Sequence, residues 1–211
     1  MVIRGSALAL VLLTGCTRVV DGPPPQAEPP VAPITAGQVV DLLSPNVLGD
    51  EGNLFVTVEP EQCAGAAREV DPPFISDHGP AATDGGHWVA DGYQRVHVEE
   101  MVGVFPADFD PLEAIADAKR SLESCRGRDF RITTMEGEQD TYTLLPPVDS
   151  GSPNILLWSF RAVDWACDNT YVAAHNAAIE ITACAPTNGF DVAELAQAAL
   201  NRIDALADTT A

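Results

Sequence analysis

The chain has 211 residues and is strongly acidic, with 31 aspartates and glutamates against 11 lysines and arginines and a formal net charge of −20. A protein of this charge repels nucleic acid and anionic lipid headgroups, so we expect neither a nucleic-acid partner nor a membrane contact held by basic side chains. Attachment to a membrane would then depend on a covalently bound lipid.

The first residues have the features of a bacterial secretory signal. Arg4 precedes an apolar run over residues 7–13, which is too short to span a bilayer, because that takes roughly 20 residues. The run ends in "LTGC" (13–16), which resembles a lipobox, whose cysteine becomes the diacylated N-terminus. We therefore expect residues 1–15 to be a lipoprotein signal peptide and Cys16 to be lipidated, rather than an ordinary signal peptide followed by an incidental cysteine. This predicts a protein anchored at the extracytoplasmic face of the cell membrane.

Residues 16–34 comprise the lipidated cysteine and a linker that is rich in proline and poor in apolar side chains. Proline restricts φ and removes a hydrogen-bond donor, so this segment is expected to be an extended, semi-rigid spacer. The remaining residues, 35–211, are numerous enough for one domain with a hydrophobic core.

Two short helices are expected at the start of the domain. The sequence "TAGQ" (35–38) forms a capping box before an apolar run that Pro45 ends, and a second helix begins near Pro60 and carries Cys63. Residues 71–92 are rich in proline, glycine, aspartate and histidine, which predicts a long ordered loop of the kind that often carries function.

The middle of the chain predicts strands around one long helix. Valines alternate with polar residues from Tyr93 to Val104, as in a half-buried strand. The sequence "DPLE" (110–113) caps a helix that ends at Gly127. Further strands are expected near 129–135, 141–145 and 155–163.

The clearest local pattern is "WACDNTYVAAHNAAIEITACA" (165–185). A hairpin that turns at residues 175–176 places Cys167 directly opposite Cys184. Cross-strand neighbours approach to ~4.5–5.5 Å between Cβ atoms, which a disulfide can close. The hairpin therefore predicts a Cys167–Cys184 disulfide.

The remaining cysteines follow from this pairing. Lipidation uses Cys16, so four cysteines remain in an oxidising compartment, and Cys63 is expected to pair with Cys125. A final helix begins at a capping box over residues 191–194. Helices packed against antiparallel hairpins make an α+β domain, which is the fold class that we expect.

No motif predicts catalysis, a metal site or a cofactor. The sequence has no GxSxG elbow and no glycine-rich nucleotide motif, and its domain cysteines are paired. His78, His87 and His97 stand near acidic residues, but no HxH or HxxxH pair occurs, so a metal site is not expected. A secreted hydrolase would need a serine or a pair of carboxylates that converges with His97 in a cleft.

Binding is the remaining class of function. We expect Trp88, His97, Trp165 and Tyr171 to line a ligand groove beneath the loop at 71–92, although plain packing in the core would also explain the aromatic residues. Trp88 stands in a polar, glycine-rich stretch, where no periodic apolar face explains its burial. The acidic charge favours a neutral or cationic ligand, or a positively charged protein partner.

Two cysteine-bearing segments, "CAGAAREVDPPF" (63–74) and "ACDNTYVAAHNAAIEITACA" (166–185), resemble the PknH-like extracellular sensor domain family of mycobacteria. The resemblance covers about residues 35–208. It implies a twisted antiparallel sheet with packed helices, two intramolecular disulfides and a cleft for an unidentified ligand. The chain contains no kinase domain, so signalling by phosphorylation is not implied.

We therefore expect a lipid-anchored, extracytoplasmic, sensor-like binding domain that is not an enzyme and that captures an unidentified cell-envelope ligand in a cleft. The alternative is a protein-interaction module that modulates a membrane partner such as a receptor kinase. An exposed apolar patch in place of a concave pocket would favour the alternative.

Overall fold

The computed structural model describes residues 34–49, 52–90, 94–186 and 190–210. The predicted signal peptide, the lipidation of Cys16 and all of the linker except Ile34 lie outside these residues. Within the described ranges, no helix is both long enough and apolar enough to cross a bilayer.

The elements in chain order are the 3-10 helix η1 (Ala36–Leu42), β1 (Phe55–Glu59), the 3-10 helix η2 (Glu61–Cys63), α1 (Ala64–Ala67), α2 (Pro73–Ser76), β2 (Ala82–Ala90), β3 (Val96–Val104), α3 (Pro111–Cys125), β4 (Asp129–Thr134), β5 (Gln139–Leu144), β6 (Ile155–Arg161), β7 (Ala166–Ala174), β8 (Ala177–Ala185) and α4 (Val192–Thr210).

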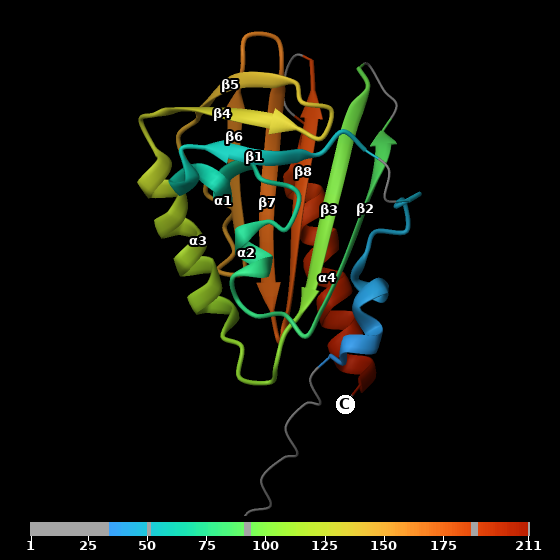
Figure 1. Ribbon diagram of the computed structural model, residues 1–211. Coiled ribbons are helices and arrows are strands. Elements are labelled where there is room, and N and C mark those ends of the chain that lie inside the picture. The colour runs from blue at the N-terminus through green and yellow to red at the C-terminus, as the bar shows by residue number, and fades with distance from the viewer. Residues whose placement is uncertain (1–33, 50–51, 91–93, 187–189, 211) are drawn as a thin grey trace, which may run out of the picture. The chain divides into compact units, whose positions relative to one another are not determined.

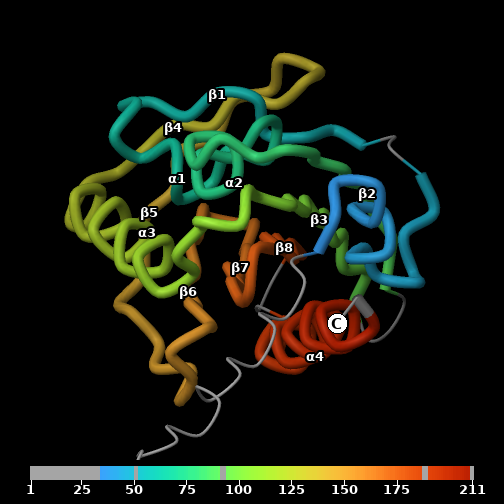
Figure 2. Tube along the Cα trace, turned by 90° about the horizontal axis from the view of Figure 1, so that it is seen from below, coloured from blue at the N-terminus to red at the C-terminus, as the bar shows by residue number. Residues whose placement is uncertain are grey.

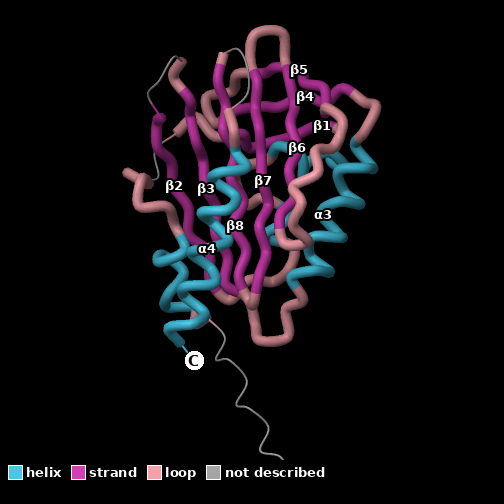
Figure 3. The backbone as a smooth tube through the Cα atoms, turned by 180° about the vertical axis from the view of Figure 1, so that it is seen from behind, coloured by secondary structure: helices cyan, strands magenta, loops and turns pink. Residues whose placement is uncertain are grey.

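The strands form one antiparallel sheet of eight strands in the order β1-β4-β5-β6-β7-β8-β3-β2. Strands β1, β4 and β5 run across the upper ends of the others, so the sheet curls on itself (Figure 1). Helices α1, α2 and α3 lie on the inner side of the curl, and α4 covers the opposite face together with η1 (Figures 2 and 3). The predicted α+β class, with an antiparallel sheet, packed helices and two disulfides, is confirmed.

The β7–β8 hairpin has the predicted register. Cys167 pairs with Cys184, their Cα atoms are 4.1 Å apart, and a disulfide joins them. Every residue of both strands is buried, because helices cover both faces of the sheet at this point. At the turn, Asn176 binds the start of the domain: its Oδ1 accepts from the backbone N–H of Ile34 at 2.7 Å, and its Nδ2 donates to the Ile34 carbonyl at 2.8 Å.

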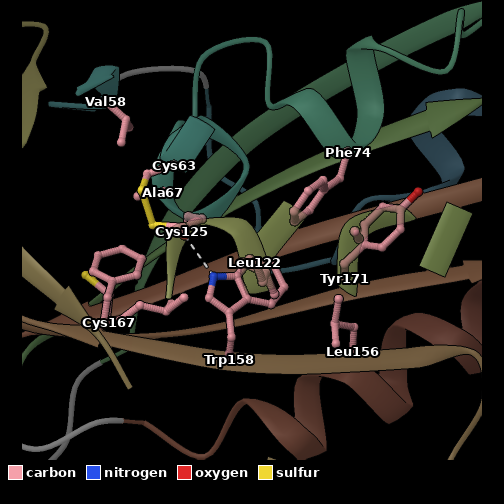
Figure 4. Close-up of a cluster of buried hydrophobic side chains, with 14 of the residues drawn as sticks. Val58, Cys63, Ala67, Phe74, Leu122, Cys125, Leu156, Trp158, Cys167 and Tyr171 are labelled. Atoms are coloured by element: carbon pink, nitrogen blue, oxygen red, sulfur yellow. Dashed lines mark hydrogen bonds between the residues drawn. A yellow bond between two sulfur atoms is a disulfide. The ribbon is translucent and has the colours of Figure 1, made fainter. Parts of the chain in front are cut away.

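The inner face of the sheet carries an aromatic core. Trp158 on β6 packs edge-on against Phe74 of α2, with ring centroids 5.7 Å apart, and its indole N–H donates to the carbonyl of Ala66 at 2.8 Å (Figure 4). The second disulfide, Cys63–Cys125, joins the end of η2 to the end of α3, and it is the pair that remained once Cys16 and the hairpin cysteines were assigned. Helix α3 is capped by the side chain of Asp110, the first residue of "DPLE", and its buried residues are Ala114, Ile115, Ala118, Leu122 and Cys125.

The outer face holds a second core and one buried ion pair. Valines of β3 and isoleucines of β8 pack there against alanines of α4. Among them lies Glu100, which is 3% exposed and pairs with Arg202 of α4. The second carboxylate oxygen of Glu100 accepts from the N–H of Ser44 at 2.9 Å, and Arg202 Nε donates to the carbonyl of Leu42 at 2.9 Å. This network fastens both the N-terminal segment and α4 to β3.

The predicted loop at 71–92 is wrong, because this stretch contains α2 and the edge strand β2. Strand β2 pairs along its whole length with β3, and this pairing overrides the weak strand propensity of glycine and aspartate. Its glycines have a steric role: a Cβ at Gly86 would stand 2.5 Å from Cγ1 of Val47, because residues 47–49 lie against the outer edge of β2. A glycine-rich sequence therefore forms a strand here, and the chain crosses it closely.

Candidate ligand-binding site

The curl of the sheet forms an open cavity of about 1070 Å³. Phe55 of β1 and His87 of β2 both line it, so the two end strands of the sheet order meet at one space. The inner side of β3, the ends of β4 and β5 and the β6–β7 connection complete the wall. Small-molecule sites in proteins usually measure about 300–1,000 Å³, so this cavity is large enough for a drug-sized ligand.

Two of the four predicted groove residues meet at this cavity. His97 of β3 and Trp165 of the β6–β7 connection both line it, and their ring centroids are 6.1 Å apart. Alternation along β3 gives His97 the inner face, because the neighbouring valines take the outer face. The sequence places both residues on the wall, although only the fold shows that they are close to each other.

The other two predicted residues lie away from the cavity. Trp88 is 6% exposed and belongs to the outer core beneath α4 and η1, because adjacent strand residues point to opposite faces of the sheet. Tyr171 is fully buried in the inner core, where its ring centroid lies 5.6 Å from that of Phe74. The structure therefore brings Trp88 and Tyr171 neither to each other nor to the large cavity.

The charged residues on the wall of the large cavity are acids. Its described lining contains two imidazoles and no lysine or arginine, and its carboxylic acids are Glu69, Glu99, Glu138, Asp140 and Asp164. These acids come from four separate places in the sequence, because Glu138 and Asp140 share one segment. No local motif joins them, and for this reason sequence reasoning missed the cluster.

Burial changes the protonation of the inner groups. Desolvation raises the pKa of Glu69 to about 8, although its Oε2 accepts from the N–H of Phe55 at 2.8 Å. Desolvation and then the charge of Glu69 raise the pKa of Glu99 to about 8. The pKa of His97 is lowered, first by desolvation and then by the charges of Arg95 and His87. At neutral pH, the inner wall of the cavity, formed by Glu69, Glu99 and His97, is thus largely uncharged.

A second cavity of about 300 Å³ adjoins the first, and Glu69 and Glu99 line both. Glu180 of β8 also lines the smaller cavity; it is 6% exposed, and its Oε2 has no hydrogen-bond partner. Desolvation, and then the charge of Glu69, raise the pKa of Glu180 well above its ordinary value. In the sequence, Glu180 is the single acid within the apolar run "AAIEITACA" (177–185), and this is the signal by which it could have been found.

Both the sequence and the fold have known relatives. The profile of the PknH-like extracellular domain family matches residues 25–202. The chain belongs to the PknH-like extracellular domain family. Among solved structures, the crystal structure of the extracellular domain of PknH from Mycobacterium tuberculosis is similar, with a TM-score of 0.62 and 16% identity over 84% of this chain and 98% of that chain. This likeness shows the shared fold. No curated protein sequence matches the chain.

A PknH-like extracellular domain with this cavity has the means to hold a ligand by shape, charge and hydrogen bonds. The four cysteines of the domain are joined in disulfides, so none of them is a free thiol nucleophile. Across the described ranges, no three histidine, cysteine or acidic side chains are arranged to hold a metal ion.

Proposed function

We propose that this PknH-like extracellular domain is a lipid-anchored, extracytoplasmic binding domain that captures a cell-envelope ligand in the large cavity without chemically changing it. The anchor is Cys16, and the proline-rich linker separates the domain from the membrane. The disulfide-linked frame keeps the cavity in shape, and the aromatic and acidic residues on its wall select the ligand.

The observation that carries this proposal is the large cavity at the meeting point of the two end strands. A cavity of about 1070 Å³ that is lined by His97, Trp165 and carboxyl groups has the size and the mixed lining of a ligand site. The strongly exposed large apolar side chains of the described residues come from different segments, among them Leu48 and Val163. The concave site therefore supports ligand capture better than the alternative of a protein-interaction module.

A hydrolytic function has one supporting feature, because Glu69 and Glu99 line the same cavity as His97. Acid–base catalysis by two carboxyl groups requires pKa values that are pushed apart, so that one group is protonated while the other is ionised. Here the pKa values of Glu69 and Glu99 are both raised to about 8, so they are not pushed apart and both groups are mainly protonated at neutral pH. This electrostatic arrangement favours binding over hydrolysis.

Native mass spectrometry tests the capture of a ligand. The unlipidated Cys16→Ala protein is incubated with a fractionated envelope extract, and we expect a discrete added mass. The Trp165→Ala variant should lose this adduct, because it removes an aromatic wall of the cavity. Val163→Ala in the same connection is the matched control and should keep the adduct, because Val163 is fully exposed. If no adduct forms and a membrane protein is recovered by pull-down instead, the interaction module becomes the better description.

The anchor is tested separately by cell fractionation. The native chain is expected in the membrane fraction, and Cys16→Ala should release it, because the acyl chains have no basic patch to assist them. A Cys16→Ala protein that stays with the membrane would contradict the lipobox interpretation.

A further inference from the structure

One carboxylate oxygen in the smaller cavity is buried without a partner. Glu180 is 6% exposed, and its Oε2 accepts no hydrogen bond in the structure. Arg68 is the basic residue whose charge lowers the pKa of Glu180. Its Nη2 donates to the carbonyl of Asp71 at 2.9 Å, its Nη1 lies 3.5 Å from Glu61, and its Nε is buried without a partner. An unsatisfied buried polar group costs about 1–3 kcal/mol, so its presence here requires an explanation.

A second unpartnered oxygen lies on the adjoining strand. Tyr171 of β7 is the direct cross-strand neighbour of Glu180, and its buried hydroxyl has no hydrogen-bond partner. The pKa of this hydroxyl is raised by burial and then by the charge of Glu180. Neighbouring side chains on one face of a sheet lie within about 4.5–5.5 Å at Cβ. Two neighbouring residues of one sheet face therefore carry side-chain oxygens without hydrogen-bond partners, and Glu180 Oε2, whose residue lines the smaller cavity, is the one that lacks a donor and that a ligand can reach.

The acidic groups at this place favour a cation, because a positive charge beside Glu69, Glu99 and Glu180 would lower their raised pKa values and favour their ionised form. The described lining of the smaller cavity includes no lysine, arginine or histidine. Its acidic residues are Glu69, Asp71, Asp84, Glu99 and Glu180, besides Glu100, whose carboxylate pairs with Arg202 on the outer face. The whole chain adds a net charge of −20, which raises the local concentration of cations. An ammonium group supplies three donors and one positive charge, which matches both the missing donors and the field.

The larger cavity provides a different surface beside this one. Trp165, Tyr142 and Phe55 contribute aromatic rings to its wall, and these rings suit an apolar body. Glu69 and Glu99 line both cavities, so a single ligand of suitable length reaches from one into the other.

We propose that the two cavities together bind a small organic cation, with a primary ammonium group beside Glu180 and an apolar body beside Trp165. This inference rests on the proposed function, because it names the ligand class of the same site. The ammonium group donates to the free oxygen of Glu180. The hydrocarbon body displaces water from the aromatic wall.

Isothermal titration calorimetry with three matched probes tests the ligand class. Phenylbutylamine, phenylbutanol and phenylbutyrate carry the same apolar body and end in a cation, a neutral hydroxyl and an anion. We expect the amine to bind the native domain about ten- to a hundredfold more tightly than the alcohol, because a charge-assisted hydrogen bond has that value. The anion should bind most weakly. Equal affinity for amine and alcohol would overturn the proposal, and this comparison needs no variant.

Charge-removing variants locate the ammonium group. Glu180→Gln is nearly isosteric and should lower the affinity for the amine about tenfold or more while leaving that for the alcohol unchanged. Glu194→Gln is the matched control, because Glu194 is an exposed acid on α4, at the opposite face of the sheet. If Glu180→Gln shows no cooperative thermal unfolding transition and is therefore not folded, Glu69→Gln takes its place, because Glu69 lines both cavities. An equal loss in Glu194→Gln would mean that the amine responds only to net charge, which overturns the site.

The failure of this inference is distinguishable from the failure of ligand capture. An envelope adduct that depends on Trp165, together with no preference for the amine, refutes the cationic class and leaves the binding function in place. The absence of both the adduct and amine binding refutes both proposals.

Discussion

The two disulfides allow a quantitative prediction, because they close loops of very different length. The separations are 62 residues for Cys63–Cys125 and 17 residues for Cys167–Cys184. In the chain-entropy account, a crosslink stabilises a protein by restricting its unfolded chain, and the effect grows with the logarithm of the loop length. For these separations the account gives about 4.3 kcal/mol for the helix-to-helix bridge and about 3.1 kcal/mol for the hairpin bridge.

The measurement compares two double variants in the unlipidated protein, Cys63→Ala/Cys125→Ala and Cys167→Ala/Cys184→Ala. Urea unfolding under non-reducing conditions, followed by tryptophan fluorescence, gives the free energy of unfolding of each. All four cysteines are buried, so the loss of packing on replacement by alanine is similar in the two variants. We therefore expect the first variant to lose about 1.2 kcal/mol more than the second, and both to unfold with a larger m-value.

The opposite order would refute this reasoning. If removal of the hairpin bridge costs more, then the bridge acts mainly on the native register of β7 and β8 rather than on the unfolded chain. A thermal scan provides a check, because about 1.2 kcal/mol corresponds to about 2–5 °C in Tm for a domain of this size.

Three further predictions concern buried polar groups. Folding raises the pKa of Glu69 from 4.5 to about 8, so the folded protein binds this proton more tightly than the unfolded chain. The free energy of unfolding should therefore fall as the pH rises from about 4.5 through 8. Glu69→Gln should flatten this fall in urea titrations at several pH values. Arg202→Met leaves the carboxylate of Glu100 buried without its ion pair and should lower the free energy of unfolding by about 3–5 kcal/mol. Arg120→Met on the exposed side of α3 is the control and should change it by less than about 0.5 kcal/mol. Equal losses would show that burial of the pair is unimportant. Trp158→Phe removes the donor to a backbone carbonyl of α1 and should cost about 1–3 kcal/mol by the same assay, and no loss would mean that this carbonyl finds another donor.

The sequence predicted those parts of the fold in which neighbouring residues determine the geometry. The β7–β8 register and its disulfide follow from strand periodicity alone, since a two-residue turn fixes every later pair. Helix α3 begins at the capping aspartate of "DPLE", and its side chain accepts from the two expected backbone N–H groups. These signals are local, so no knowledge of distant contacts was needed.

The parts that escaped prediction depend on long-range contacts. Strand β2 has a loop-like composition, and it becomes a strand because β3 on one side and residues 47–49 on the other supply its hydrogen bonds. The acidic cavity lining has the same character, since Glu69, Glu99 and Glu180 come from a loop and two separate strands. Trp88 shows the converse difficulty: its burial is due to the outer core, which no local pattern around it indicates.

The attachment of Ile34 to the hairpin turn has a mechanical consequence. Asn176 holds both the N–H and the carbonyl of Ile34, and a third bond joins Asn176 to the carbonyl of Phe105 at the end of β3. A pull on the chain at Ile34 therefore loads the tip of the central hairpin directly instead of first unravelling a terminal segment. Force that enters at this residue is shared by β3, β7 and β8. Strands β3 and β8 line both cavities, and β7 belongs to the core beside them.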